Sequence, residues 1–317
     1  MKQYVDSSIE AYNTVKLLVV TGGECFTLGK DLDQIVQYAA NKGLMVRVVT
    51  NGYWATTYEK AFARLKKLVD AGLQEFNVST GDEHQKWVPY DNVIWAVAAA
   101  LELNIVTVVN VETSKIAQFS VEKLKTDPRL EKYKPVFDEK LKIIAGVWLP
   151  FVKTTKEKFE AYAKEKDNPF IVSKNVNRCT NLFNSFHIYP TSHLYACCGL
   201  TIEYIPFLHL GSAKKHPLKF LYDYQFQDFL KIWLFTEGPR KILDFCLTKR
   251  NLPVVNTSDW HICQICIEIF KDKQNIALLQ QNYQEVFSNV IFKYSMLKKR
   301  YSPLLNTNSH ENEQKFN

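Results

Sequence analysis

Short apolar strands alternate with amphipathic helices along the first half of the chain, and this alternation constrains the fold more than any other feature. Apolar runs rich in β-branched residues predict buried strands, and apolar residues at helical spacing predict helices packed on them. The order is strand then helix, four times over, followed by a last strand. The predicted strands span residues 17–20, 45–50, 75–79, 105–111 and 142–148, and the predicted helices span 31–42, 57–71, 89–102 and 121–133, the last one broken at Pro128. This order favours an α/β fold with a parallel sheet and right-handed crossovers.

Two glycines and a glutamate follow the first predicted strand and are candidate ligand-binding residues. Gly22, Gly23 and Glu24 come directly after Thr21, where the apolar run has ended. Glycine has no side chain, so a ligand can lie against its backbone, and the carboxylate of Glu24 suits an ammonium group. Ligands of α/β proteins gather at the carboxyl ends of parallel strands. The alternative interpretation is a tight turn with a solvated Glu24.

A second segment at the end of the next strand adds weight to the first. Thr21-Gly22-Gly23-Glu24 is followed by an amphipathic helix, and then by a strand that ends in Thr50-Asn51-Gly52. This pair of segments, at this separation, resembles the radical SAM enzymes over residues 15–151. The resemblance implies a partial (β/α)6-type parallel barrel whose first strand is missing here. It also implies that Gly22, Gly23 and Glu24 hold the amino group of S-adenosylmethionine.

Polar residues at the ends of later strands are further candidates. In radical SAM proteins such side chains contact the ribose and carboxylate of the cofactor, and the resemblance assigns this role to Ser79 and Asn110. Asp82 and His84 fit the same edge, and the alternatives for them are a helix cap or a solvated side chain. For Glu112 we favour a surface position, and for Cys25 a small buried thiol.

The chain departs from the family pattern at its most important motif. The family's Cys-x3-Cys-x2-Cys sequence, which holds the catalytic [4Fe–4S] cluster, belongs upstream of Gly22, yet residues 1–21 contain no cysteine. Residues 7–13 resemble the helix that follows the cluster loop. Two explanations stay open: the motif precedes the given start, or the protein is a relative without that cluster. The chain alone does not support the catalytic cluster.

A second set of cysteines lies in the later part of the chain. Cys179 and Cys197 flank a segment in which Pro190-Thr191-Ser192-His193 predicts a hairpin turn, and Cys263 and Cys266 have the two-residue spacer that lets one segment offer two thiolates to one metal. The four thiolates suit an iron–sulfur cluster or a structural zinc ion, and unligated thiols are a further alternative. His187, His193 or His261 could add a ligand, although satisfied or solvated histidines are commoner.

This second set resembles the auxiliary-cluster extension of radical SAM proteins, known as SPASM or, in its shorter form, twitch. The resemblance implies a [4Fe–4S] auxiliary cluster on Cys179, Cys197, Cys263 and Cys266, with Cys198 and Cys246 as alternates. The family hairpin carries glycine five residues before the second cysteine, where this chain has Ser192. The full pattern has more cysteines than the chain supplies, so the single-cluster form fits better.

Composition limits the classes of partner. Seven cysteines without an apolar leader predict a reducing, cytoplasmic compartment. The sequence contains no run of about 18 apolar residues, so we expect no membrane span. The net charge of +7 permits an acidic partner, but the lysines are dispersed along the predicted helices, which disfavours nucleic-acid binding.

Together these features predict a barrel over residues 1–151, a small cysteine-bearing α+β extension over 152–305 and a disordered tail over 306–317. The extension has a predicted helix over residues 156–166 and predicted helical stretches over residues 220–234 and 275–299. The implied function is S-adenosylmethionine binding and hydrogen abstraction from a peptide or protein substrate, with a reductant such as a flavodoxin or ferredoxin, provided that the missing cluster segment exists. The alternative is a non-catalytic relative that acts as a metal-stabilised binding or scaffold protein. The sequence names no general acid or base.

Overall fold

The computed structural model describes residues 1–113, 117–147, 178–185, 187–197, 205–257 and 260–305. The chain divides into two compact units, Met1–Phe170 and Ile171–Asn317, and each has its own hydrophobic core. The predicted boundary at residues 151–152, the predicted helix over 156–166 and the tail over 306–317 lie outside the described residues. None of the described helices is long and apolar enough to cross a membrane.

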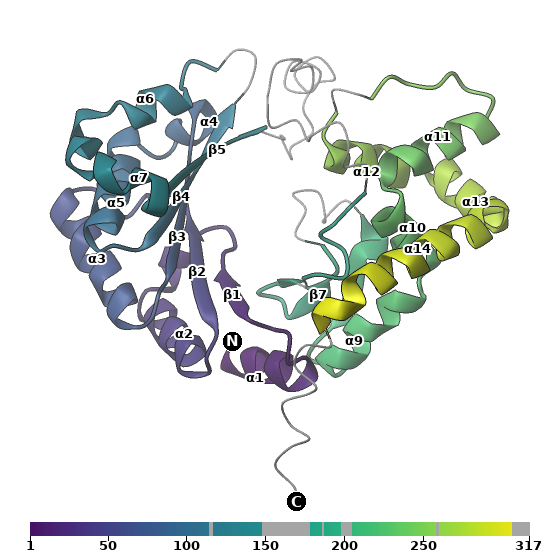
Figure 1. Ribbon diagram of the computed structural model, residues 1–317, viewed down its shortest axis with the longest axis horizontal. Coiled ribbons are helices and arrows are strands. Elements are labelled where there is room, and N and C mark those ends of the chain that lie inside the picture. Colours follow the sequence, from purple (N-terminus) through teal and green to yellow (C-terminus); the bar gives the residue numbers. More distant parts are fainter. Residues whose placement is uncertain (114–116, 148–177, 186, 198–204, 258–259, 306–317) are drawn as a thin grey trace, which may run out of the picture. The chain divides into compact units, whose positions relative to one another are not determined.

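A five-stranded parallel sheet forms the centre of the first unit (Figure 1), and the strands follow one another in chain order. Each strand lies within two residues of its predicted bounds, because each is a short β-branched apolar run. The strands are β1 (Leu17–Val20), β2 (Met45–Thr50), β3 (Glu75–Thr80), β4 (Val106–Thr113) and β5 (Leu141–Val147). The α/β prediction with a parallel sheet is thereby confirmed.

Three amphipathic helices connect the first four strands and pack their apolar faces into one core. These are α2 (Lys30–Asn41), α3 (Tyr58–Asp70) and α5 (Tyr90–Glu102), and each starts and ends within one residue of its prediction. The Thr57 side chain accepts a hydrogen bond from the backbone N–H of Lys60 and so begins α3. Since sequential parallel strands have right-handed crossovers, these helices share one side of the sheet, as Figure 1 shows for α3 and α5.

The remaining helical segments of this unit are short or displaced from their predicted positions. α1 (Lys2–Ala11) begins earlier than the predicted residues 7–13. The predicted helix over 121–133 is indeed broken by proline, into α6 (Val121–Lys125) and a 3₁₀ helix over Pro128–Val136 that leads into α7 (Phe137–Lys140). One helical turn, α4 (Asp82–Gln85), follows β3 directly.

The two faces of the parallel sheet differ in chemistry. Side chains alternate along each strand, and register partners of parallel strands share a face. The face toward the helices is apolar and buried, with Val48, Phe76, Val78, Val109 and Val111 at 0% exposure. The opposite face carries Arg47, Glu75, Asn77, Ser79 and Asn110. On it, the Arg47 Nη2 donates to Glu75 Oε2 at 2.7 Å.

The second unit combines a small antiparallel sheet with helices. The sheet has the order β6 (His187–Ile188), β7 (His193–Tyr195) and β8 (His209–Ser212). The helices are α9 (Leu218–Tyr224), α10 (Phe229–Thr236), α11 (Pro239–Lys249), α12 (Ile262–Phe270), α13 (Lys273–Asn282) and α14 (Gln284–Leu305). Their apolar faces meet around Trp233, which is 1% exposed.

Two predictions for this unit can be compared directly with the structure. The hairpin is confirmed, since β6 and β7 pair antiparallel around a turn in which Ser192 has φ +65°. The stretches 220–234 and 275–299 are helical, as predicted, and each is divided between two α-helices, α9 and α10 in the first and α13 and α14 in the second. In the first stretch the Asp228 side chain accepts hydrogen bonds from the Leu230 and Lys231 backbone N–H groups and so starts α10. In the second, α13 ends at Asn282 and α14 begins at Gln284.

Candidate functional site

The backbone after β1 is open to a ligand. Gly22 has φ +120°, a conformation that favours glycine, and Gly22 and Gly23 are both exposed. No atom lies within 4 Å of a Cβ placed on either residue. The backbone of the two glycines is therefore uncovered by other parts of this unit, and its role as a ligand-binding surface stays a prediction.

The Glu24 carboxylate already accepts hydrogen bonds from two neighbouring segments. Its Oε1 accepts from the Phe26 backbone N–H at 3.0 Å and from the Thr50 hydroxyl at 2.7 Å, and its Oε2 accepts from the Asn51 backbone N–H at 2.8 Å. A carboxylate has about four acceptor sites, so these three bonds leave room for about one further donor. Glu24 is thus first a tie between the ends of β1 and β2, with limited capacity for an ammonium group.

Ser79 and Asn110 lie side by side on neighbouring strands. Their Cα atoms are register partners in β3 and β4, both side chains are half-buried, and both are on the face that carries Arg47 and Glu75. The structure therefore brings these two predicted residues together. The glycines and Glu24 follow β1, which is separated from β3 by β2.

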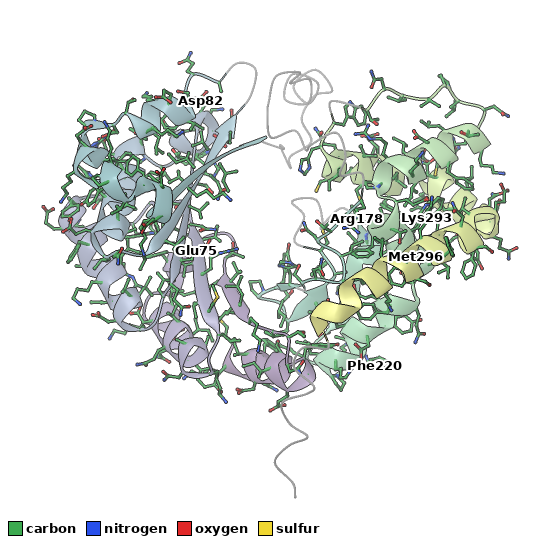
Figure 2. The ribbon with its side chains drawn as sticks, viewed as in Figure 1. Glu75, Asp82, Arg178, Phe220, Lys293 and Met296 are labelled. Carbon is green, nitrogen blue, oxygen red and sulfur yellow. The ribbon has the colours of Figure 1, made fainter. Side chains whose placement is uncertain are left out.

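The segment after β3 holds a cluster whose role the sequence only partly indicated. Both carboxylate oxygens of Asp82 accept backbone hydrogen bonds, from Gln118 at 2.6 Å and from Phe119 at 3.0 Å. Figure 2 shows Asp82 beyond the carboxyl end of β3, while Glu75 lies at the start of that strand. Asp82 therefore joins two loops and is half-buried, and its role at the strand edge stays a prediction.

Glu112 is also a correction, because the surface position predicted for it is wrong. Its side chain is 8% exposed, and it accepts from the His84 backbone N–H at 2.8 Å and contacts His84 Nδ1 at 2.7 Å. One signal could have shown this position. Glu112 stands two residues after Asn110 and so shares its face of the sheet.

Cys25 has the predicted environment of a small buried thiol. It is 1% exposed, and its Sγ donates to the Val49 carbonyl at 3.2 Å. Burial raises the pKa of Cys25 to about 12, so the thiol stays protonated at neutral pH.

Four cysteines converge in the second unit from three separate segments. The Cys179 backbone N–H bonds to the Leu234 carbonyl at the end of α10, and Cys197 follows β7. Cys263 and Cys266 are the second and fifth residues of α12, so they lie at the start of a helix rather than in a loop. All four line one small cavity, together with Leu182, Ile205, Leu208, Leu234, Pro239 and Ile262. The predicted set is therefore gathered at one place with apolar surroundings.

The thiols of this set influence one another's ionisation. A hydrogen bond from Cys197 lowers the pKa of Cys179, whereas desolvation raises the pKa of Cys266 well above its ordinary value. Negative charge on Cys263 and Cys179 raises the Cys266 pKa further. Several thiolates in one apolar cavity repel each other, and a bound cation removes that repulsion.

The residue types at this cavity fit both a tetrathiolate zinc site and a [4Fe–4S] cluster. Within the described part of the chain, however, no group of three or more His, Cys, Asp or Glu side chains is placed closely enough to hold a metal ion. The thiols thus share a cavity without the spacing of a closed coordination sphere. A change of one staggered χ1 rotamer moves a cysteine sulfur by about 3 Å.

The alternate ligands have other surroundings. Cys246 lies on α11, fully buried in the apolar core of its unit, and burial raises its pKa to about 12. Cys198 lies outside the described residues. His261 Nδ1 accepts from the Cys263 backbone N–H at 3.2 Å and begins α12, so this histidine acts as a helix cap. His193 Nδ1 lies 3.0 Å from the Thr191 hydroxyl.

No protein-family model matches the chain, and no curated protein matches it.

Proposed function

We propose that the protein is a radical SAM-type iron–sulfur protein that carries an auxiliary [4Fe–4S] cluster on Cys179, Cys197, Cys263 and Cys266. The observation that carries this proposal is the convergence of these four cysteines on one apolar cavity. The hairpin adds support, because Ser192 adopts φ +65° at the position where the family has glycine. The parallel sheet is then part of a (β/α)6-type barrel.

The chain's own residues have separate roles in this proposal. When bound, the cluster would either transfer electrons or bind the substrate. Leu208, Leu234 and Ile262 exclude water from the thiolates. Cys263 lies in the first turn of α12, where the helix dipole stabilises negative charge, and Cys266 follows in the second turn. At the other site, Gly22 and Gly23 form the surface for S-adenosylmethionine, with Ser79 and Asn110 as polar contacts. A peptide or protein substrate and a flavodoxin or ferredoxin reductant belong to the same proposal.

The first test is metal content. Protein purified without oxygen and reconstituted with iron and sulfide should bind about four iron atoms at this site and absorb visible light. The variant Cys263→Ser should lose most of that iron, and the matched control Cys246→Ser should keep it. Stoichiometric zinc in a colourless protein, lost in Cys263→Ser, would replace the cluster by a structural zinc site. Equal metal content in the two variants would overturn the site.

The second candidate function is a non-catalytic binding or scaffold protein with a metal-stabilised second unit. The three hydrogen bonds that Glu24 accepts within the chain favour it, because they reduce the capacity of this carboxylate for a ligand. Calorimetric titration with S-adenosylmethionine separates the two functions. Binding that Gly22→Val abolishes supports the enzyme, whereas no binding to the metal-loaded protein supports the scaffold.

A further inference from the structure

One face of α14 is apolar and exposed. Phe292 is 65% exposed and Met296 is 54% exposed, and because they stand four residues apart they lie next to each other on the helix. Figure 2 labels Met296 on this helix, together with Lys293. The opposite face packs into the core of the second unit, where Val290 is 0% exposed and Tyr294 is 8% exposed. Phe292 and Met296 are therefore exposed on a helix whose position is fixed by its other face.

The charges on this part of α14 are all positive. Residues 286–305 contain no aspartate or glutamate and four basic residues, Lys293, Lys298, Lys299 and Arg300. The Lys293 Nζ is paired with Glu237 Oε1 at 2.6 Å. Lys298 instead lies over the rings of Phe226 and Tyr294, and it forms no ion pair with any residue that the structure describes. The surface beside Met296 is therefore cationic and complements an acidic partner.

A second copy of the chain fits this face less well than an acidic partner does. In a symmetric dimer the same patch lies on both sides of the interface, so each copy would bring the same positive charge to it. Like charges that face each other across an interface lower its stability. The charge on α14 therefore favours a different protein over a second copy.

This helix is also close to the cysteine cavity of the same unit. Leu182 and Leu234 line the cavity, and the residues that follow them in the chain, Phe183 and Phe235, contact Tyr294 of α14. The ring centroids of Phe183 and Phe235 lie 6.1 and 6.0 Å from that of Tyr294. The diameter of one helix, about 10–12 Å, and one layer of side chains thus separate the exposed face of α14 from the residues that line the cavity.

We propose that the face of α14 that carries Phe292, Met296 and Lys298 is the docking site of an acidic electron-transfer protein, the carrier. This inference rests on the proposed function, because it needs a redox-active metal site at the four cysteines. Apolar residues of the carrier cover Phe292 and Met296, and its carboxylates face Lys298 and the two basic residues that follow it. The carrier loses one electron and the metal site gains it, and no bond is made or broken.

Calorimetric titration of the full chain tests the proposal, with an oxidised flavodoxin and, separately, a ferredoxin as the carrier at low ionic strength. We expect the double variant Phe292→Ser/Met296→Ser and the variant Lys298→Glu each to bind the carrier roughly tenfold more weakly than the wild type does. Phe220→Ser on α9 and Lys241→Glu on α11 change equally exposed residue types elsewhere in this unit, and these matched controls should bind like the wild type. Added salt should weaken the binding of the wild type more than that of Lys298→Glu.

The proposal would be overturned if neither carrier bound the wild type, or if the double variant and the wild type bound with equal affinity. A wild type that sediments as a dimer, with a monomeric double variant, would assign this face to a second copy instead. Wild-type binding to vesicles of phosphatidylglycerol and phosphatidylcholine, lost in the double variant and without carrier binding, would assign it to a membrane surface.

Failure of the proposed function gives a different result from failure of the docking site. Carrier binding is measured on the protein with and without metal, whereas the proposed function fails when no iron is bound. A protein that binds iron but no carrier therefore keeps the cluster and loses this docking site. A protein that binds the carrier through α14 but no iron keeps the docking site and loses the cluster.

Discussion

At the scale of single residues, two glutamates link neighbouring segments at the carboxyl edge of the parallel sheet. Glu24 is half-buried and Glu112 is buried. Glu24 joins the end of β1 to that of β2, and Glu112 joins the end of β4 to the loop after β3. A carboxylate removed from water is tolerated only when hydrogen bonds replace its hydration. Glu24 and Glu112 therefore stabilise the structure of this edge, and glutamate is also a residue type that binds ligands.

Gly81 gives a direct test of this edge. We expect Gly81→Ala to lower the free energy of unfolding of the first unit by about 2–4 kcal/mol, since the new Cβ meets Glu112 and φ +138° is strained for alanine. Gly23→Ala is the matched control, because its Cβ would meet nothing within 4 Å. Urea unfolding of the three proteins measures the difference. Equal stability of Gly81→Ala and the wild type would show that the loop is not packed against Glu112.

At the scale of elements, turns and helix starts decide where the functional side chains lie. α12 begins at Ile262 with a capping box between His261 and Gln264. Because the helix begins here, Cys263 and Cys266, which are three residues apart in the sequence, lie on one helix face. The β6–β7 turn similarly determines where Cys197 leaves the small sheet.

Ser192 tests the turn. We expect Ser192→Gly to be neutral or to stabilise the protein by up to about 1 kcal/mol, because glycine adopts φ +65° without steric cost. Ser192→Val should destabilise it by about 1–3 kcal/mol, because a β-branched residue tolerates this conformation poorly. Thermal unfolding measures both, with Thr191→Val as a control at the adjacent exposed position. A destabilising Ser192→Gly would mean that the buried serine side chain matters more than its backbone.

Asp127 accepts hydrogen bonds from two segments of the first unit, and its ionisation should make the stability of that unit depend on pH. It accepts hydrogen bonds from the Arg129 side chain at 2.8 Å and from the Tyr90 hydroxyl at 3.0 Å, and the Arg129 bonds lower its pKa below the ordinary 3.8. A lowered folded-state pKa stabilises the protein at neutral pH, and this contribution decreases from about pH 4 downward until the pH has passed the lowered folded-state pKa. Asp127→Asn should therefore lower the Tm at pH 6 and much less at pH 3.

The control for that titration is Asp70→Asn, which alters an exposed ion pair with Lys66. An exposed pair contributes little, so its Tm difference from the wild type should be small at both pH values. A Tm difference for Asp127→Asn that is the same at pH 6 and pH 3 would contradict the role assigned to the Asp127 carboxylate.

At the scale of the whole molecule, the proposed metal site and the division into two units together predict that removal of the metal destabilises the second unit alone. Each unit has its own core, and the four cysteines belong to the second. Because metal binding is coupled to folding, chelation should weaken hydrogen-exchange protection in peptides from residues 205–257 and 260–298. Peptides from residues 1–113 should keep theirs. Equal loss in both units, or loss in neither, would contradict a metal-stabilised second unit.

The bounds of strands and helices could be predicted where the signal was local. The apolar run at 45–50 and the helical spacing at 31–42 determine their elements through neighbouring residues, so their bounds could be predicted closely. Asp228 was missed as a helix start, because it lies within a stretch rich in aromatic and leucine residues, where the apolar pattern hides a single N-cap residue. The burial of Glu112 depends on how the loop after β3 meets β4, a contact between distant segments.

The amino-acid sequence by itself determined the order of strands and helices, the parallel sheet and the identity of the four candidate thiols. These follow from periodicity, β-branched runs and cysteine spacing, which act over a few residues. Only the tertiary structure decided that Glu24 is engaged by Thr50 and Asn51, that Glu112 is buried against His84 and that the four thiols share one cavity. The physical reason is that burial and hydrogen bonding between remote residues depend on the register and packing of whole elements.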